Sequence, residues 1–232
     1  MKDKVVLFYP PYSGPPLGAP LCLLSLASPL LEAGFRVSLI DGVVEPDFER
    51  VVAREIDEAL CLGVSILTGP MIGSAIKISH MVRRIRPGLP IVFGGWHPSL
   101  LPDQTLTPDF VDAVVRGQGE LTLLEIAQRL TEGKSLEGVR GASFKRGGKI
   151  VQNSERPVEN INHLPPPAFH LVDFDAYERI RGRREIGYAT SVGCPYACNY
   201  CTDQVYYKRR FNAYRAERVV GEVSDLVERY RL

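Results

Sequence analysis

The sequence predicts an α/β fold built on a doubly wound, five-stranded parallel sheet. Short apolar runs rich in β-branched residues alternate with longer amphipathic stretches through the first 132 residues. Glycine and proline stand at most of the junctions between them. The connections are short, as expected where helices cover both faces of a parallel sheet.

Five runs are expected to be strands because they are short, apolar and bounded by turn residues. They cover residues 4–9, 35–40, 62–67, 90–93 and 111–115. The first is followed by a long Gly/Pro loop over residues 12–20. The expected strand order is 2-1-3-4-5, and in such sheets ligands bind beyond the carboxyl ends of the strands, where the winding reverses.

Helices are expected between these strands because apolar residues recur there at helical spacing. They cover residues 21–33, 48–59, 74–86 and 121–131, and a short irregular or helical piece continues to about residue 107. Gly34 follows the first helix in the place of a glycine cap.

The composition changes after this α/β domain, which we place at residues 1–132. Residues 133–180 are expected to form a hairpin over 141–152, turning at Gly147 and Gly148, and then a stiff connector that begins at 164–167. Residues 181–232 are expected to form a strand over 186–192, a cysteine-containing loop and a helix over 213–231.

The overall composition excludes several classes of protein. A net charge of +1 provides no general field for nucleic acid. The amino-terminal apolar run is too short for a secretory signal, and Pro29 interrupts an apolar stretch too brief to span a membrane, so a cytoplasmic location is expected. Five cysteines argue against a disulfide framework, and Cys22 and Cys61 are expected to be small core residues.

The other three cysteines, Cys194, Cys198 and Cys201, lie within eight residues of one another. Soft thiolates at this spacing suit zinc or an iron–sulfur cluster. A structural zinc site normally has four protein ligands. The nearest upstream histidine, His170, lies across a proline-rich run, and no histidine follows Cys201.

The pattern C-x3-C-x2-C, with Tyr200 before its last cysteine, resembles the cluster motif of the radical S-adenosylmethionine (SAM) enzymes. The resemblance implies that the three cysteines hold three irons of a [4Fe–4S] cluster and that SAM binds the fourth. It also implies that Tyr200 positions the adenine of SAM through its backbone, and that an external flavodoxin-type or ferredoxin-type protein donates electrons. No catalytic residue beyond the cluster is expected within this chain.

Glycines cluster at the carboxyl ends of the third, fourth and fifth predicted strands. Turn geometry alone could require them, but their clustering favours a broad, flat ligand that approaches the backbone. The pieces Ser65-x-Leu67-Thr-Gly69, Gly94-Gly-x-His-Pro98 and Arg116-Gly-x-Gly-Glu120 resemble the flavodoxin-like cobalamin-binding domain that precedes the barrel in one branch of the radical SAM family. The cobalamin contacts that this resemblance implies are Ser65, Leu67, Thr68, Gly69, Met71, Gly94, Gly95, His97, Pro98, Gly117, Gln118, Gly119 and Glu120.

One departure from other cobalamin domains concerns the cobalt. Domains of the methionine synthase type carry D-x-H-x-x-G after the second strand, whereas residues 41–46 here read Asp-Gly-Val-Val-Glu-Pro. No histidine from that loop is therefore expected on cobalt, and His97 is expected to make a hydrogen bond or a cap. The phosphate-binding motifs G-x-G-x-x-G and G-x-x-x-x-G-K-[ST] are absent, which disfavours a nicotinamide or ATP domain.

The resemblance implies a cobalamin-dependent radical SAM methyltransferase acting on a small molecule. One alternative is a radical SAM cyclase-like enzyme that transfers no methyl group. Others are a cobalamin carrier without a working barrel and a zinc-stabilised, flavodoxin-like interaction domain. A barrel needs roughly 200 residues, judged from the ~250 of a full barrel, so residues 181–232 are expected to be the first β/α unit of a partial TIM-like barrel in a longer enzyme.

Overall fold

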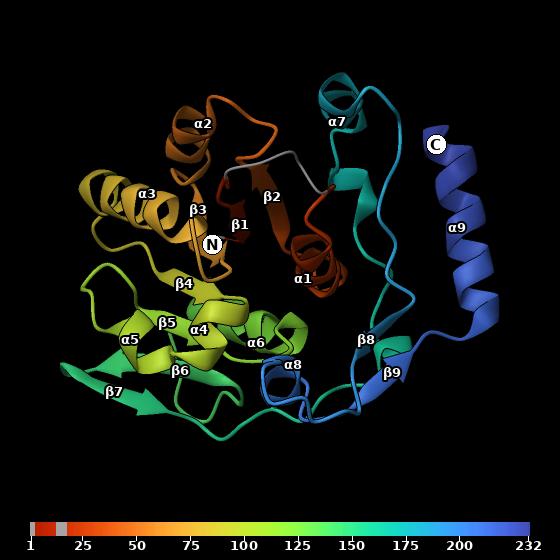
Figure 1. Ribbon diagram of the computed structural model, residues 1–232. Coiled ribbons are helices and arrows are strands. Elements are labelled where there is room, and N and C mark those ends of the chain that lie inside the picture. Colours follow the sequence, from red (N-terminus) through yellow and green to blue (C-terminus); the bar gives the residue numbers. More distant parts are fainter. Residues whose placement is uncertain (1–2, 13–17) are drawn as a thin grey trace.

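The structure is a computed structural model that describes residues 3–12 and 18–232. The Gly/Pro loop predicted over residues 12–20 therefore lies largely outside the described residues. Figure 1 shows a central sheet with helices on both faces, and the carboxyl-terminal helix standing at one side.

The main sheet has the strand order β2-β1-β3-β4-β5-β6-β7. Its first five strands run parallel to one another and follow the predicted order. The strands are β1 (Lys4–Tyr9), β2 (Arg36–Asp41), β3 (Ala59–Ser65), β4 (Ile91–Gly94), β5 (Ala113–Val115), β6 (Ala142–Arg146) and β7 (Lys149–Gln152). The predicted α/β class is thus confirmed.

The strand count is corrected from five to seven. The hairpin β6–β7 joins the same sheet, because β6 pairs antiparallel with β5, with Ala113 opposite Phe144. Without it the outer edge of β5 would present unpaired N–H and C=O groups, which sheets avoid by covering or pairing an edge. Sequence periodicity identified the hairpin but not its partner.

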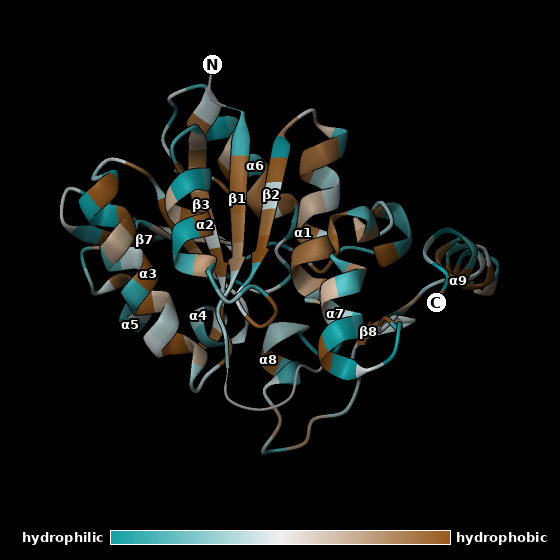
Figure 2. Ribbon diagram, turned by 90° about the horizontal axis from the view of Figure 1, so that it is seen from above, coloured by the Kyte–Doolittle hydropathy of each residue, from teal (hydrophilic) through white to brown (hydrophobic). Residues whose placement is uncertain are grey.

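The centre of the sheet is β1, whose residues Val5 to Phe8 are fully buried. Alternate side chains point to opposite faces of a strand. Val6 and Phe8 accordingly pack in one core with α2 (Phe48–Glu55) and α3 (Met71–Ile85), and Val5 and Leu7 pack in another with α1 (Leu21–Glu32) and α6 (Glu120–Thr131). In Figure 2 the apolar strands β1, β2 and β3 lie between these two layers.

Two short helices, α4 (Trp96–Leu100) and α5 (Pro102–Leu106), connect β4 to β5. The connector after the sheet contains two 3₁₀ turns, Ile161–His163 and Phe169–Leu171, and then α7 (Phe174–Arg181). The last part contains β8 (Ser191–Gly193), α8 (Asp203–Tyr206), β9 (Phe211–Ala213) and α9 (Ala216–Tyr230).

The strand predicted over residues 186–192 is shorter than expected. Only its end pairs, as β8, antiparallel with β9. Ile186 and Tyr188 instead pack in a small core with Leu24 of α1 and Leu226 of α9. In the described ranges, the helices are all too short or too polar to cross a membrane.

Candidate functional site

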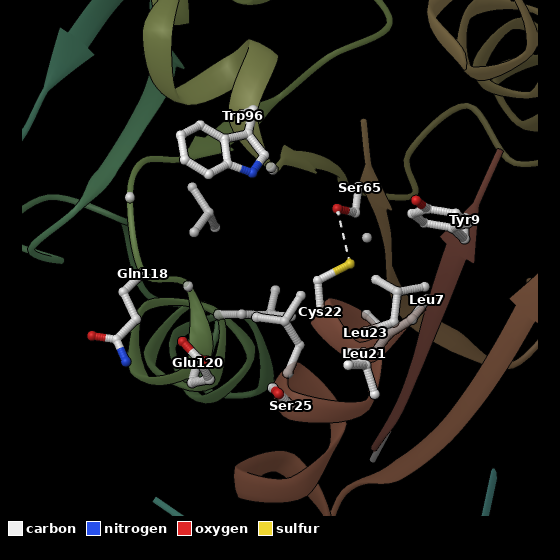
Figure 3. Close-up of a pocket in the computed structure, with 18 of the residues that line it drawn as sticks. Leu7, Tyr9, Leu21, Cys22, Leu23, Ser25, Ser65, Trp96, Gln118 and Glu120 are labelled. Atoms are coloured by element: carbon white, nitrogen blue, oxygen red, sulfur yellow. Dashed lines mark hydrogen bonds between the residues drawn. The ribbon is translucent and has the colours of Figure 1, made fainter. Parts of the chain in front are cut away.

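A cavity of about 280 Å³ opens beyond the carboxyl ends of β3, β4 and β5, between α1 and α6. Parallel strands end there side by side, at the position where ligands bind in doubly wound sheets. Figure 3 shows residues of β1, β3, α1, α4 and α6 around it. Apart from a few polar groups the lining is apolar, as is usual for small-molecule sites.

The structure brings many of the predicted cobalamin contacts together around this cavity. They come from the ends of β3 and β4 and from the loop that enters α6. Those that line it are Ser65, Leu67, Gly94, Gly95, Gly117, Gln118, Gly119 and Glu120.

The remaining predicted contacts do not line the cavity. Thr68 and His97 form a hydrogen bond between Oγ1 and Nδ1 at 3.1 Å. Met71 is 2% exposed and belongs to the core beneath α3, and Pro98 is buried at the centre of α4. Gly69 has a φ of +133° and open space around it, which fits a backbone requirement of its turn.

The glycines around the cavity serve different purposes. Gly95 has a φ of +95°, and a Cβ there would lie 2.6 Å from the carbonyl oxygen of Ile66. A Cβ on Gly94 would meet nothing closer than Cβ of Val115 at 3.7 Å. The backbone conformation and the close packing at residue 95 therefore require a glycine. Neither requires one at residue 94, where the absence of a side chain leaves the backbone open to the cavity.

Three polar groups stand out in the apolar lining. Cys22, expected to be a core residue, instead lines the cavity and is exposed, and desolvation by the surrounding protein raises the pKa of its thiol. Its Sγ lies 3.8 Å from Oγ of Ser65, and Figure 3 shows the two groups pointing toward each other. Burial raises the pKa of Glu120, against the effect of hydrogen bonds from the backbone N–H groups of Glu120 and Gly119.

An aromatic group at the cavity was not identified by the sequence analysis. Trp96 of α4 stacks on Tyr206 of α8 with ring centroids 4.3 Å apart, and Tyr207 lies edge-on to Trp96 at 6.2 Å. All three residues line the cavity. The position of Trp96 between Gly95 and His97 was the available signal in the sequence, but nothing local linked it to residues 206 and 207.

The three cysteines of the motif lie in the loop between β8 and α8, and all are free thiols. The backbone N–H of Cys201 donates to the carbonyl oxygen of Cys198 at 3.0 Å, which makes this part of the loop a tight turn. Cys198 is exposed, and Tyr200 is 91% exposed. Across residues 3–12 and 18–232, no three His, Cys, Asp or Glu side chains are gathered closely enough to hold a metal ion. The donor chemistry fits an iron–sulfur cluster, and the ligand assignment stays a prediction.

Comparison with known families and relatives gives matches over most of the chain. The B12 binding domain family matches residues 4–127. An uncharacterized methyltransferase of Pyrococcus horikoshii is 31% identical, over 98% of this chain and 51% of that protein. The anaerobic magnesium-protoporphyrin IX monomethyl ester cyclase of a Synechocystis strain is 30% identical, over 89% of this chain and 43% of that protein. The chain therefore spans about half the length of these relatives.

The fold is also that of a solved structure. The radical S-adenosylmethionine methyltransferase TsrM from Kitasatospora setae, with cobalamin and a [4Fe–4S] cluster bound, superposes with a TM-score of 0.79. The superposition covers 99% of this chain and 46% of TsrM, at 22% identity. At this identity the match establishes the fold, and it extends through the cysteine motif and α9.

Proposed function

The chain belongs to the B12-binding domain family, and from this premise we propose that it is the N-terminal portion of a cobalamin-dependent radical SAM methyltransferase. One observation carries the proposal: Tyr206 and Tyr207, just after the cysteine motif, line the same cavity as the loops of the family-matched domain. A single short segment thus connects the cysteines to the cavity. Chemistry that uses two cofactors on one substrate requires such proximity.

The cavity residues would hold cobalamin, which when bound supplies a cobalt centre that carries and donates a methyl group. Gly94 would let the cofactor approach the backbone closely. Ser65 and Glu120 would orient it through hydrogen bonds, since they are among the few polar groups in an apolar wall. We propose no histidine on cobalt from residues 41–46, because that loop contains none.

The cysteines Cys194, Cys198 and Cys201 would hold the cluster, which when bound supplies the electron that cleaves SAM to methionine and a 5′-deoxyadenosyl radical. Their loop is open enough for a cluster to be assembled on it, because Cys198 is exposed and all three thiols are free. Tyr200, which leaves its side chain in solvent, would contact the adenine of SAM through its backbone. An external electron donor and a small-molecule substrate complete the proposal.

A second candidate is a radical SAM cyclase reaction without methyl transfer. The observation that favours it is the 30% identity to the magnesium-protoporphyrin ester cyclase. Methyl transfer is preferred because the Pyrococcus horikoshii relative, which matches over more of this chain, is named a methyltransferase.

Anaerobic reconstitution with iron, sulfide and hydroxocobalamin tests the proposal. We expect bound cobalamin and about four irons per chain, seen in visible spectra and metal analysis. Cobalamin without iron would support a carrier instead. Zinc alone, with neither cobalamin nor iron, would contradict both readings.

The ligand assignment is tested with Cys198→Ala and the matched control Cys61→Ala. Cys198 lies in the motif, whereas Cys61 is fully buried in the sheet. The first variant should lose the iron and keep cobalamin, and the control should keep both. Equal iron content in the two variants would count against the three-cysteine site.

A further inference from the structure

Helix α8 is a direct continuation of the cysteine loop. It begins two residues after Cys201, and its Gln204 donates a side-chain hydrogen bond to the carbonyl oxygen of Cys198 at 3.1 Å. The N–H of Cys201 donates to the same carbonyl. The turn that carries the second and third cysteines is therefore tied to the first turn of α8.

The carboxyl-terminal end of α8 lines the cavity, through Tyr206 and the next residue, Tyr207. The N–H groups of Tyr206 and Tyr207 donate to the carbonyl oxygens of Thr202 and Asp203, at 3.1 and 2.8 Å, which fixes both tyrosines relative to the start of the helix. Both residues line the cavity, and Trp96, which lines it too, stacks directly on Tyr206. Burial raises the pKa of both phenols, which shows that the surrounding protein desolvates them.

Helix α8 lies beside the loop that enters α6. A Cβ built on Gly117 would be 3.5 Å from the carbonyl oxygen of Tyr206, an ordinary van der Waals distance. A Cβ on Gly193 of β8 would in turn be 3.0 Å from Cβ of Tyr207. Tyr206 and Tyr207 thus lie between the loop that enters α6 and strand β8, which precedes the cysteines.

We propose that Tyr206 and Tyr207 bind cobalamin together with Trp96, and that α8 couples the loading of the cavity to the conformation of the cysteine turn. This inference rests on the proposed function. A ligand that fills the cavity would contact these residues, because they are part of its lining. Any displacement or ordering of α8 is transmitted to Cys198 and Cys201 through the hydrogen bonds described above. The coupling is reciprocal, as binding linkage requires.

The binding role is tested by equilibrium dialysis of the whole chain with cyanocobalamin. Tyr206→Ala and Tyr207→Ala should each raise Kd at least about fivefold, because each removes an aromatic contact in a desolvated site. Tyr206→Phe should bind nearly as tightly as the parent, since it keeps the ring. Val205→Ala is the matched control: Val205 lies on the same helix, is 47% exposed and does not line the cavity.

Far-UV circular dichroism shows whether each variant is folded. Tyr206→Leu, which keeps apolar bulk but removes the ring, should also bind more weakly and replaces any Ala variant that does not fold. If the parent binds no cyanocobalamin, the proposed function fails. If the parent binds and the folded variants that lack a tyrosine ring bind equally well, only this inference is overturned.

The coupling is tested by amide hydrogen exchange over residues 198–207. Saturating cyanocobalamin should slow exchange at Tyr206 and Tyr207 and also at Cys201, which lies outside the cavity. In Tyr206→Ala at saturation, the protection at Cys201 should fall. Protection at the tyrosines with no change at Cys201 would overturn the coupling.

Discussion

Gly95 gives the sharpest test of how the cavity is built. It has φ +95° and ψ −167°, a backbone region almost restricted to glycine. In Gly95→Ala the new Cβ would lie 2.6 Å from the carbonyl oxygen of Ile66 and 3.0 Å from Oγ of Ser65. The first of these is a backbone atom of the residue that directly follows β3, and it cannot rotate away as a side chain could.

Two costs add in this variant. The backbone conformation costs about 1–3 kcal/mol for a residue with a Cβ. Overpacking against a rigid neighbour costs about 1–3 kcal/mol more. With partial relaxation we expect the free energy of unfolding to fall by about 2–4 kcal/mol, which lowers Tm by roughly 5–15 °C for a chain of this size.

The matched control is Gly94→Ala, one residue earlier. Its Cβ would be 3.7 Å from the nearest atom and its φ is not positive, so the free energy of unfolding should change little. It should weaken cobalamin binding instead, because the methyl group would enter the cavity. Urea unfolding followed by circular dichroism measures both variants, and equal stability for the two would refute the reasoning.

Two further variants test contacts around the sheet. The hydroxyl of Tyr177 in α7 donates to the buried carboxylate of Asp41 in β2. Tyr177→Phe removes this hydrogen bond and should lower the free energy of unfolding, measured with urea, by about 1–3 kcal/mol. An unchanged unfolding midpoint would contradict that role. Glu55 lies 2.7 Å from the Lys4 ammonium, which lowers the pKa of its carboxyl to about 2 against the effect of burial. A depressed pKa stabilises the fold above the ordinary value of 4.5 and less as pH falls toward 2. Glu55→Gln should therefore lower the free energy of unfolding by about 1 kcal/mol at pH 7, and by progressively less below pH 4.5. Glu58→Gln, at a more exposed ion pair, should match the parent throughout this pH range.

The main sheet could be predicted because its signals are local. The run from Val5 to Phe8 is apolar at every position, which is typical of a central parallel strand, and the predicted order of the five parallel strands is confirmed. The predicted cobalamin-binding family is confirmed as well. The pairing of β6 with β5 could not be predicted, because a hairpin carries no local record of which edge it will cover.

The candidate site was predicted in part for the same reason. Ser65, Gly94 and Glu120 lie at the ends of strands or the start of a helix, where topology alone places them near one another. Met71, chosen from the same loop pattern, turns into the core instead. Which side of a loop a residue faces depends on packing that no periodicity records.

The sequence by itself determined the α/β class, the strand order around β1 and the grouping of three cysteines in one short stretch. These follow from residue type and spacing, which act over a few positions of the chain. Only the tertiary structure decided that Trp96 meets Tyr206, that Cys22 faces Ser65, and that α8 joins the cysteine turn to the cavity. Contacts between segments so far apart in the sequence depend on how whole elements pack, because shape and burial select them and local propensity does not.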